Sequence, residues 1–156
     1  MDYTYKIATV NINGISAPTR IQMFEEFLYK HGIDLALLQE VTNSKITTIR
    51  RYTSYINMET EGRGTAILAK DNYLLTNIQR IPTGRGISAH FNGIRIVSIY
   101  APSGSEKRHE RQEFYNSDVA HLLMHSTYNM VLAGDFVFLR PLIVWVHLMS
   151  SEHSQD

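Results

Sequence analysis

The stretch Asp34-Leu-Ala-Leu-Leu-Gln-Glu40 decides how the rest of the chain is interpreted. Four consecutive apolar residues between polar ends predict a short strand that is buried on both faces, as in an α/β sandwich. The strand ends in Gln39 and Glu40, which places a carboxylate at the mouth of an apolar sheet. An isolated glutamate at such a point usually only solvates a loop, but open sheets also bind ligands beyond the carboxyl ends of their strands. Glu40 is therefore a candidate site residue.

Two other apolar segments end in the same way. Residues 5–12 predict a first strand that carries Asn11 near its end, and residues 130–133 predict a buried strand that runs into Gly134 and Asp135. Strand ends are rigid platforms for side chains, so one explanation is needed for all three. We expect Asn11, Glu40 and Asp135 to converge at one end of the fold.

The segment between the first two strands predicts an amphipathic helix. Apolar residues recur at helical spacing from Ile21 to Leu28, Ser16 is a candidate N-cap, Pro18 suits the first turn, and Gly32 stops the helix. The order strand, helix, strand predicts that the two flanking strands are parallel and adjacent.

The middle of the chain predicts further strands and a second helix. Asn92-Gly93 between two strand-like runs is a strong hairpin signal. Ser103 and Glu106 have the spacing of a capping box, which predicts a helix that extends to Ser126. The other expected strands cover residues 55–57, 65–69, 74–81, 87–91 and 94–100.

The last segment departs from this pattern. Residues 136–146 are apolar but interrupted by Arg140-Pro141, and a polar tail follows. The segment is either one last strand or a terminus foreign to the domain. We therefore expect one domain over residues 1–136 and a divergent tail over residues 137–156.

Composition places the chain among globular proteins. Of its 156 residues, 44% are hydrophobic and 19% are charged, which excludes a disordered chain. Fifteen basic and fifteen acidic residues balance, so net charge gives no argument for or against a nucleic-acid partner. The absence of cysteine, of a signal peptide and of a membrane-spanning run predicts an intracellular location, nuclear or cytoplasmic, with no membrane association.

The residue types at the three strand ends suggest a chemistry. Glu40 and Asp135 would repel each other at close range unless a cation or a proton lay between them. Mg²⁺ prefers few carboxylates, keeps several waters and accepts phosphate oxygens as its remaining ligands. Asn11 and Tyr100 are neutral hydrogen-bonding groups that suit phosphate oxygens or a bound water. Together these are the parts of a metal-assisted phosphodiester hydrolysis site.

Five short motifs occur in order along the chain and carry a family resemblance. They are Thr9-Val-Asn-Ile-Asn-Gly14, Leu37-Leu-Gln-Glu40, Gly64-Thr-Ala-Ile-Leu68, Ser98-Ile-Tyr-Ala-Pro102 and Leu132-Ala-Gly-Asp-Phe136. Their order resembles the exonuclease–endonuclease–phosphatase superfamily, and most of all the apurinic-type endonuclease domain of LINE-like non-LTR retrotransposons. The resemblance covers residues 5–136, roughly the first two thirds of that family's domain.

The resemblance implies a fold, a reaction and a role for each matched residue. The fold would be an α/β, DNase I-like four-layer sandwich of two mixed β-sheets flanked by helices, incomplete at the C-terminus. Glu40 would hold Mg²⁺, with Mn²⁺ as an alternative ion, and Asp135 would orient or deprotonate the attacking water. Asn11 would place Asp135 and the phosphate, with Asn13 a weaker candidate near the metal, and Tyr100 would hydrogen-bond the scissile phosphate. The reaction would nick DNA and leave a 3′ hydroxyl that a partner reverse transcriptase domain could extend.

The chain also departs from the family pattern. Val137 stands where the family has Asn after Gly-Asp-Phe, and the chain is too short for the later motifs, which end in Ser-Asp-His. Ser151-Glu152-His153 resembles that last motif, although a chance match in a Ser/His-rich tail is the better explanation. The phosphate-binding half of the site is therefore missing or rebuilt.

These departures keep other interpretations open. The chain could be a catalytically inactive remnant that acts as a binding or interaction module, or a phosphodiesterase for a phosphoinositide or nucleotide substrate. His121 and His125 have a spacing that can bind Zn²⁺, but they lack the glutamate of a zinc-protease motif. Five basic residues are candidates for DNA backbone contacts or for plain solvated surface: Arg63, Arg85, Lys107, Arg108 and Arg111.

Overall fold

The computed structural model describes residues 3–42, 44–58, 62–123, 129–135 and 142–148. Its strands form two sheets, ordered β3-β4-β2-β1-β9 and β5-β6-β7-β8. The strands are β1 (Tyr3–Asn11), β2 (Leu35–Val41), β3 (Tyr52–Asn57), β4 (Gly64–Lys70), β5 (Thr76–Arg80), β6 (Gly86–Phe91), β7 (Ile94–Tyr100), β8 (Asn129–Asp135) and β9 (Leu142–Leu148). Both sheets are mixed, because β1 and β2 pair in parallel, β7 and β8 also pair in parallel, and the other pairs are antiparallel.

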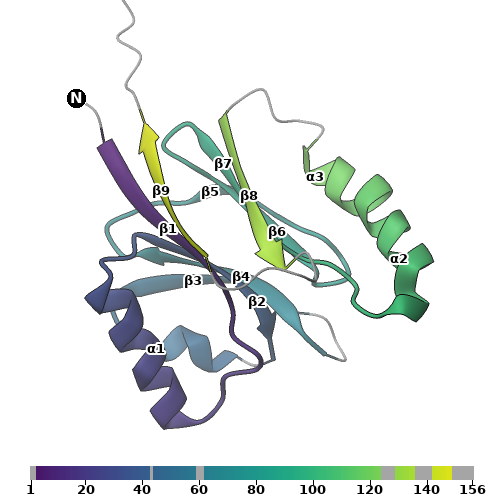
Figure 1. Cartoon of the computed structure of the whole chain (residues 1–156). Coiled ribbons are helices and arrows are strands. Elements are labelled where there is room, and N and C mark those ends of the chain that lie inside the picture. Colours follow the sequence, from purple (N-terminus) through teal and green to yellow (C-terminus); the bar gives the residue numbers. More distant parts are fainter. Residues whose placement is uncertain (1–2, 43, 59–61, 124–128, 136–141, 149–156) are drawn as a thin grey trace, which may run out of the picture.

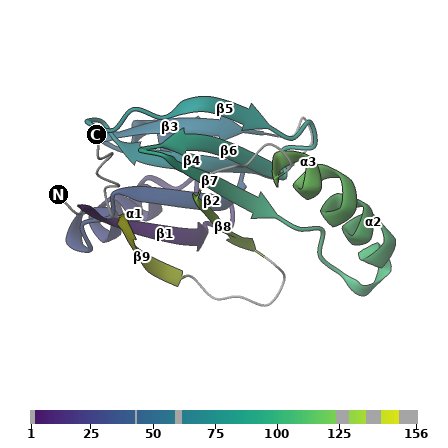
Figure 2. The same ribbon diagram turned by 90° about the horizontal axis from the view of Figure 1, so that it is seen from above.

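The two sheets face each other and carry helices on their outer faces (Figures 1 and 2). Helix α1 (Pro18–Lys30) packs on the β2 sheet through Phe24 and Leu28, and the second helical segment packs on the β7 sheet through Phe114 and Leu122. The middle cluster of apolar side chains joins the two sheets. The predicted four-layer α/β sandwich is confirmed. Among the described residues, no helix is both long and apolar enough to cross a membrane.

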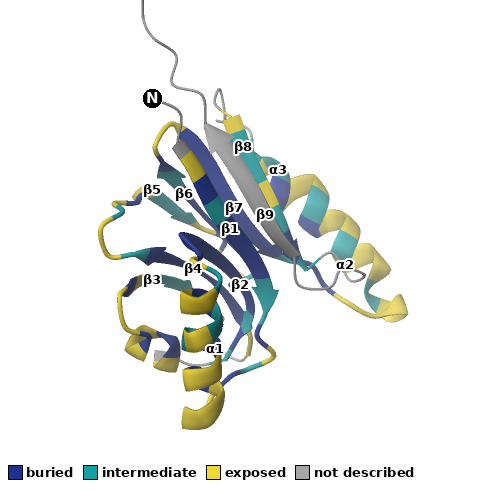
Figure 3. Cartoon of the chain, turned by 60° about the vertical axis from the view of Figure 1, so that its left-hand side comes forward, coloured by how far each residue is buried: buried dark blue, intermediate teal, exposed yellow. Residues whose placement is uncertain are grey.

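Strand β2 is the central strand of its sheet and is covered on both faces. Leu35 and Leu37 face the opposite sheet, whereas Ala36 and Leu38 face α1, and all four are fully buried. Burying a leucine side chain contributes about 1.5–3 kcal/mol, so this strand is a main source of stability. The buried sheets and the exposed outer face of α1 are contrasted in Figure 3. The predicted parallel pairing of the first two strands is confirmed.

Helix α1 begins without the predicted Ser16 cap. Its N-cap is Ala17, no side chain caps it, and Pro18 is the first helical residue. Proline sets the helical φ and has no N–H to satisfy, so the helix starts well without a side-chain cap. The carbonyl of Ala17 accepts the first helical hydrogen bond from Ile21, and the Ser16 carbonyl accepts one from Lys45.

The second helical segment also starts differently from prediction. It comprises a 3₁₀ turn η2 (Ser105–Lys107), α2 (Arg108–Glu113), a π-helical turn η3 (Phe114–Val119) and α3 (Ala120–Leu123). The N-cap is Gly104, with φ +101°, and no capping box forms. Arg111 instead donates hydrogen bonds to the carbonyls of Pro102 and Gly104, which ties the loop before this segment to α2. The predicted end at Ser126 lies outside the described residues.

Two further strand predictions have clear outcomes. The hairpin of β6 and β7 turns at Asn92 and Gly93, which both have positive φ, as this turn requires. In the tail, β9 pairs antiparallel with β1 along seven residues, from Tyr3 opposite Leu148 to Thr9 opposite Leu142. Of the two interpretations of the tail, the structure therefore shows a last strand that covers the free edge of β1. A 3₁₀ turn, η1 (Ser44–Thr48), connects β2 to β3.

Candidate active site

Four strands present alternate side chains to the space between the sheets, and the character of these side chains changes along each strand. Successive residues of a strand point to opposite faces, so every second residue shares a face. On the face toward the opposite sheet, each strand therefore carries a row of alternate residues. Each row begins with apolar residues and ends with a polar residue at the carboxyl end of the strand. The rows are Ile7-Thr9-Asn11 in β1, Leu35-Leu37-Gln39 in β2, Ile96-Ser98-Tyr100 in β7 and Val131-Ala133-Asp135 in β8.

Asn11 joins the two predicted carboxylates. Its Nδ2 donates hydrogen bonds to Glu40 Oε1 at 3.1 Å and to Asp135 Oδ2 at 2.7 Å. Its Oδ1 accepts the backbone N–H of Asn13 at 2.9 Å, so the orientation of the amide is fixed and its NH₂ group faces both acids. Glu40 and Asp135 are 29 and 124 positions from Asn11 in the sequence, and both contact its side chain. The expected convergence of the three residues is therefore observed.

Glu40 reaches this position through an irregularity in β2. The pairing with β4 shifts between Gln39 and Val41, which is a β-bulge, and Glu40 has φ +55°. Regular alternation would turn Glu40 toward α1, whereas the bulge turns it to the side of Asn11. The Glu40 carbonyl accepts a hydrogen bond from Gly14 at 2.9 Å, which holds the bulge. A glutamate in the left-handed region is strained, and such strain clusters at functional sites.

Tyr100 lies beside Asp135 at the ends of two parallel strands. The two residues pair in register, and the Ala101 N–H donates to the Asp135 carbonyl at 3.1 Å. Burial, and then the charge of Glu40, raises the pKa of the Tyr100 phenol. The hydroxyl therefore keeps its proton and stays a hydrogen-bond donor at neutral pH. The Arg85 guanidinium lies 4.9 Å from the centroid of the Tyr100 ring, a cation–π contact that supports the ring.

A buried polar layer lies one step below these residues. Gln39 is 1% exposed, and its Nε2 donates to Ser98 Oγ at 3.1 Å, to Thr9 Oγ1 at 3.2 Å and to the Leu37 carbonyl at 3.1 Å. Ser98 Oγ in turn donates to the Leu38 carbonyl at 3.2 Å. The layer connects the two sheets by side-chain hydrogen bonds, and it fixes the spacing of the strand ends that carry the site.

We expect Gln39→Leu to lower the free energy of unfolding by about 1–3 kcal/mol, because it leaves buried hydroxyls of Thr9 and Ser98 without their partner. Urea denaturation measures this change. The matched control is Gln22→Leu on the exposed face of α1, where Gln22 bonds only Glu26 and the change should stay within about 0.5 kcal/mol. Equal midpoints for the wild type and Gln39→Leu would contradict a supporting role for the layer.

Two residues of the site were not assigned these roles from the sequence. Arg63, considered above only as a DNA contact, forms an ion pair with Glu40 through Nη1 and Oε2. Tyr115, to which no role was assigned above, lies near enough to Asp135 for that charge to act on its phenol. Burial raises the pKa of its phenol, Asp135 raises it further, and Arg111 lowers it. The spacing of aromatic and basic residues in the sequence gave no signal for the position of either residue.

Several predicted candidates do not join the site. His121 is exposed on α3, and Arg111 is engaged with the carbonyls of Pro102 and Gly104. Asn13 is exposed and contacts Asn11 through its backbone N–H. Lys107 lies 3.9 Å from Glu110, and Arg108 is exposed at the start of α2. His125, Val137 and Ser151-Glu152-His153 lie outside the described residues.

The donor set fits a hard divalent cation of the Mg²⁺ type. Glu40 and Asp135 both accept a hydrogen bond from Asn11 Nδ2, so these two acidic side chains lie a few ångströms apart. Such a pair favours a bound cation. In the described part of the chain no three His, Cys, Asp or Glu residues cluster as a metal site. Mg²⁺ needs only one or two carboxylates when water and phosphate complete its shell, so Glu40 and Asp135 suffice.

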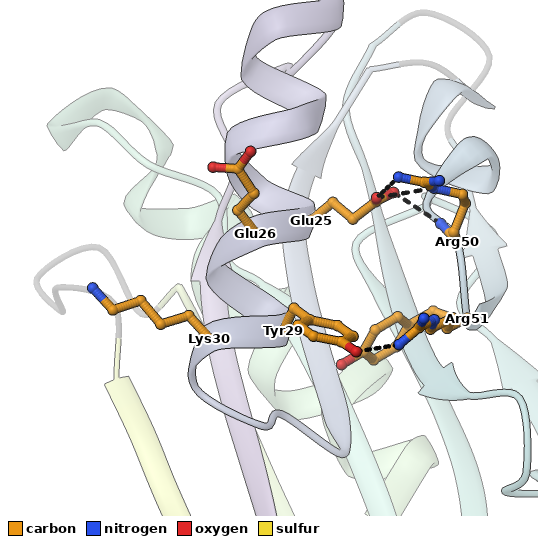
Figure 4. Close-up of a pocket in the computed structure, with 7 residues that line it drawn as sticks. Glu25, Glu26, Tyr29, Lys30, Arg50 and Arg51 are labelled. Atoms are coloured by element: carbon orange, nitrogen blue, oxygen red, sulfur yellow. Dashed lines mark hydrogen bonds and ion pairs between the residues drawn. The ribbon is translucent and has the colours of Figure 1, made fainter.

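A separate pocket of about 370 Å³ lies between α1 and residues 50–52 (Figure 4). Arg50 contacts Glu25 through three hydrogen bonds, and Arg51 donates to the Tyr29 hydroxyl. The side chains of Arg50 and Arg51 thus both have hydrogen-bond partners on α1. The pocket shares no lining residue with the Asn11–Glu40–Asp135 cluster.

The fold is similar to that of several proteins of known structure. An AP endonuclease from Archaeoglobus fulgidus matches with a TM-score of 0.69 and 22% identity, over 84% of this chain and 56% of that one. A humanized D. rerio TDP2 matches with a TM-score of 0.69 and 16% identity, over 85% and 62% of the two chains. A 3′-5′ exonuclease from Neisseria meningitidis matches with a TM-score of 0.69 and 20% identity, over 84% and 57%.

These matches concern structure alone. No protein-family model matches the chain, and no curated protein matches it in sequence. The chain spans between about half and three fifths of the length of the solved structures just named. Over the matched part, each TM-score of 0.69 shows a common fold. The chain therefore has the DNase I-like fold.

Proposed function

We propose that this chain is a divalent-metal-dependent DNA phosphodiesterase of the exonuclease–endonuclease–phosphatase superfamily, related to the endonuclease domain of LINE-like retrotransposons. The observation that carries the proposal is the double hydrogen bond of Asn11 to Glu40 and Asp135. Support comes from the fold, which is shared with an AP endonuclease and with NExo from Neisseria, a 3′-5′ exonuclease and 3′ phosphatase that was also solved with a product DNA hairpin. The domain would occupy residues 1–136, with residues 137–156 as a divergent tail whose β9 completes one sheet edge.

Each residue has a role in this reaction. Glu40 would hold Mg²⁺ or Mn²⁺, which when bound would stabilise negative charge on the phosphate. Asp135, held by Asn11, would accept a proton from the attacking water and orient that water. Tyr100, whose phenol is protonated at neutral pH, would donate a hydrogen bond to the phosphate as the negative charge on the phosphate increases. The strand nick would leave a 3′ hydroxyl, which a reverse transcriptase of the parent element would extend.

A plasmid assay tests the proposal. We expect the purified chain to convert supercoiled plasmid to the nicked circle with Mg²⁺ or Mn²⁺, to stop in excess EDTA, and to recover when Mg²⁺ is added back. DNA polymerase should extend the nicked product without prior treatment, since the end is a 3′ hydroxyl. Equal nicking in EDTA, or no nicking with either ion, would overturn the proposal.

The alternative function is a non-catalytic interaction module. In the described part of its sheet β8 has β7 as neighbour on one side only, and Leu132 on β8 is 38% exposed. Parallel strands are normally buried on both faces, so this edge favours pairing with another polypeptide. A chain that fails to nick DNA with either ion and self-associates through β8 would fit this alternative.

A further inference from the structure

Arg63 forms an ion pair with Glu40, the carboxylate that would bind the proposed metal. It directly precedes β4, whose Gly64 lies opposite Val41 of β2, so the pairing of these strands brings Arg63 to the Glu40 bulge. Its Nη1 pairs with Glu40 Oε2. The Arg63 side chain is 47% exposed and that of Glu40 is 13% exposed, so the contact lies at the mouth of the site.

Both oxygens of Glu40 are therefore engaged. Oε1 accepts from Asn11, and Oε2 pairs with the guanidinium. A guanidinium that donates to Oε2 and a cation that binds the same oxygen compete for the same lone pairs and repel each other. Asn11 is neutral and does not compete in this way. Arg63 is thus the group that must move before Glu40 can bind a divalent cation.

The Arg63 contact is easy to exchange. A half-exposed arginine–carboxylate pair contributes little stability, typically below about 1 kcal/mol. Guanidinium groups also bind phosphate with charge-assisted, often bidentate hydrogen bonds. A DNA phosphate that enters the site would be a second anionic partner for Arg63. When Arg63 pairs with the phosphate, Glu40 becomes available to bind the cation.

We propose that Arg63 acts as a latch on Glu40 that competes with the divalent cation and transfers to the DNA phosphate. This inference rests on the proposed function. It makes binding of the cation and binding of the phosphodiester mutually favourable, because each releases the Arg63–Glu40 pair. Such coupling is reciprocal, so the cation raises the affinity for DNA by the same factor. Without DNA, the latch keeps affinity for the cation low.

Mn²⁺ titration followed by electron paramagnetic resonance tests the latch without any measurement of activity. The proteins are the wild type, Arg63→Met, Arg50→Met and Glu40→Gln, each alone and with a short phosphorothioate DNA duplex. Methionine keeps an unbranched apolar stem while removing the charge. Arg50→Met is the matched control, since Arg50 pairs with Glu25 in a different part of the molecule (Figure 4).

We expect Arg63→Met to bind Mn²⁺ about two- to fivefold more tightly than the wild type in the absence of DNA. The duplex should tighten Mn²⁺ binding in the wild type and in Arg50→Met, but clearly less in Arg63→Met. Glu40→Gln should bind weakly throughout. Identical Mn²⁺ affinities for wild type and Arg63→Met would overturn the latch and leave the proposed function intact. Absence of Mn²⁺ binding in every protein, with and without DNA, would overturn both.

Discussion

Glu40→Gln and Asp135→Asn should each lower the rate of plasmid nicking by about 10²–10³-fold, the usual cost of removing one group that stabilises charge in a transition state. Each change keeps the size of the side chain and removes one negative charge. Both acids accept from Asn11, so each variant also perturbs the partner that holds the other acid. Initial rates at saturating Mg²⁺ measure the effect.

The stability of the same variants separates catalysis from a structural role. Two carboxylates that share one donor repel each other, and Glu40→Gln loses in exchange only the half-exposed pair with Arg63, so neutralising either acid should change the melting temperature little. A structural role predicts instead a lower melting temperature together with lower activity. Glu25→Gln is the control, because it removes a carboxylate from the Arg50 pair on α1 and should leave nicking unchanged. Full nicking activity in Glu40→Gln or Asp135→Asn would refute the assignment of the site.

The placement of three site residues follows from simple periodicity. Asn11, Tyr100 and Asp135 extend rows of alternate residues that start apolar and face the opposite sheet. A period of two and parallel pairing therefore suffice to bring them to one end. The metal and catalytic roles of these residues remain predictions, since the structure shows where they lie and not what they do.

The placement of Glu40 could not be obtained in the same way. Strict alternation sends it to the α1 side, and only the bulge with its positive φ reverses that direction. Glycine, asparagine and aspartate signal such a conformation in a sequence, whereas glutamate does not. The pairing of Arg63 with Glu40 depends on the same bulge and on the pairing of β2 with β4, which is distant in sequence. It could therefore not be predicted from the sequence either.

The helix starts show a different limit. Ser16 and the Ser103–Glu106 spacing are valid cap signals, yet neither forms a cap. Pro18 removes the need for the first, and at the second the Lys107 N–H donates to the Gly104 carbonyl in a 3₁₀ turn. A local motif predicts that a helix begins nearby, but the surrounding backbone decides at which residue.

Gly134→Ala should destabilise the fold by about 3 kcal/mol or more, and it should also lower nicking activity. Gly134 pairs with Ile99 in register, and a Cβ at this position would lie 2.0 Å from the Ile99 carbonyl oxygen. The obstructing atoms belong to the backbone of β7, so no side-chain rotation relieves the clash. The φ of +156° adds strain for any L-residue. Urea denaturation measures the loss.

The control for this variant is Gly62→Ala, at which an added Cβ meets no atom of the described residues within 4 Å. It should change the free energy of unfolding by less than about 0.5 kcal/mol. The comparison isolates the close approach of β8 to β7, which sets the position of the residue that follows Gly134. That residue is Asp135, so a β8 displaced by the alanine carries the carboxylate away from Asn11. Gly134→Ala with wild-type stability and activity would show that this close contact does not hold the site together.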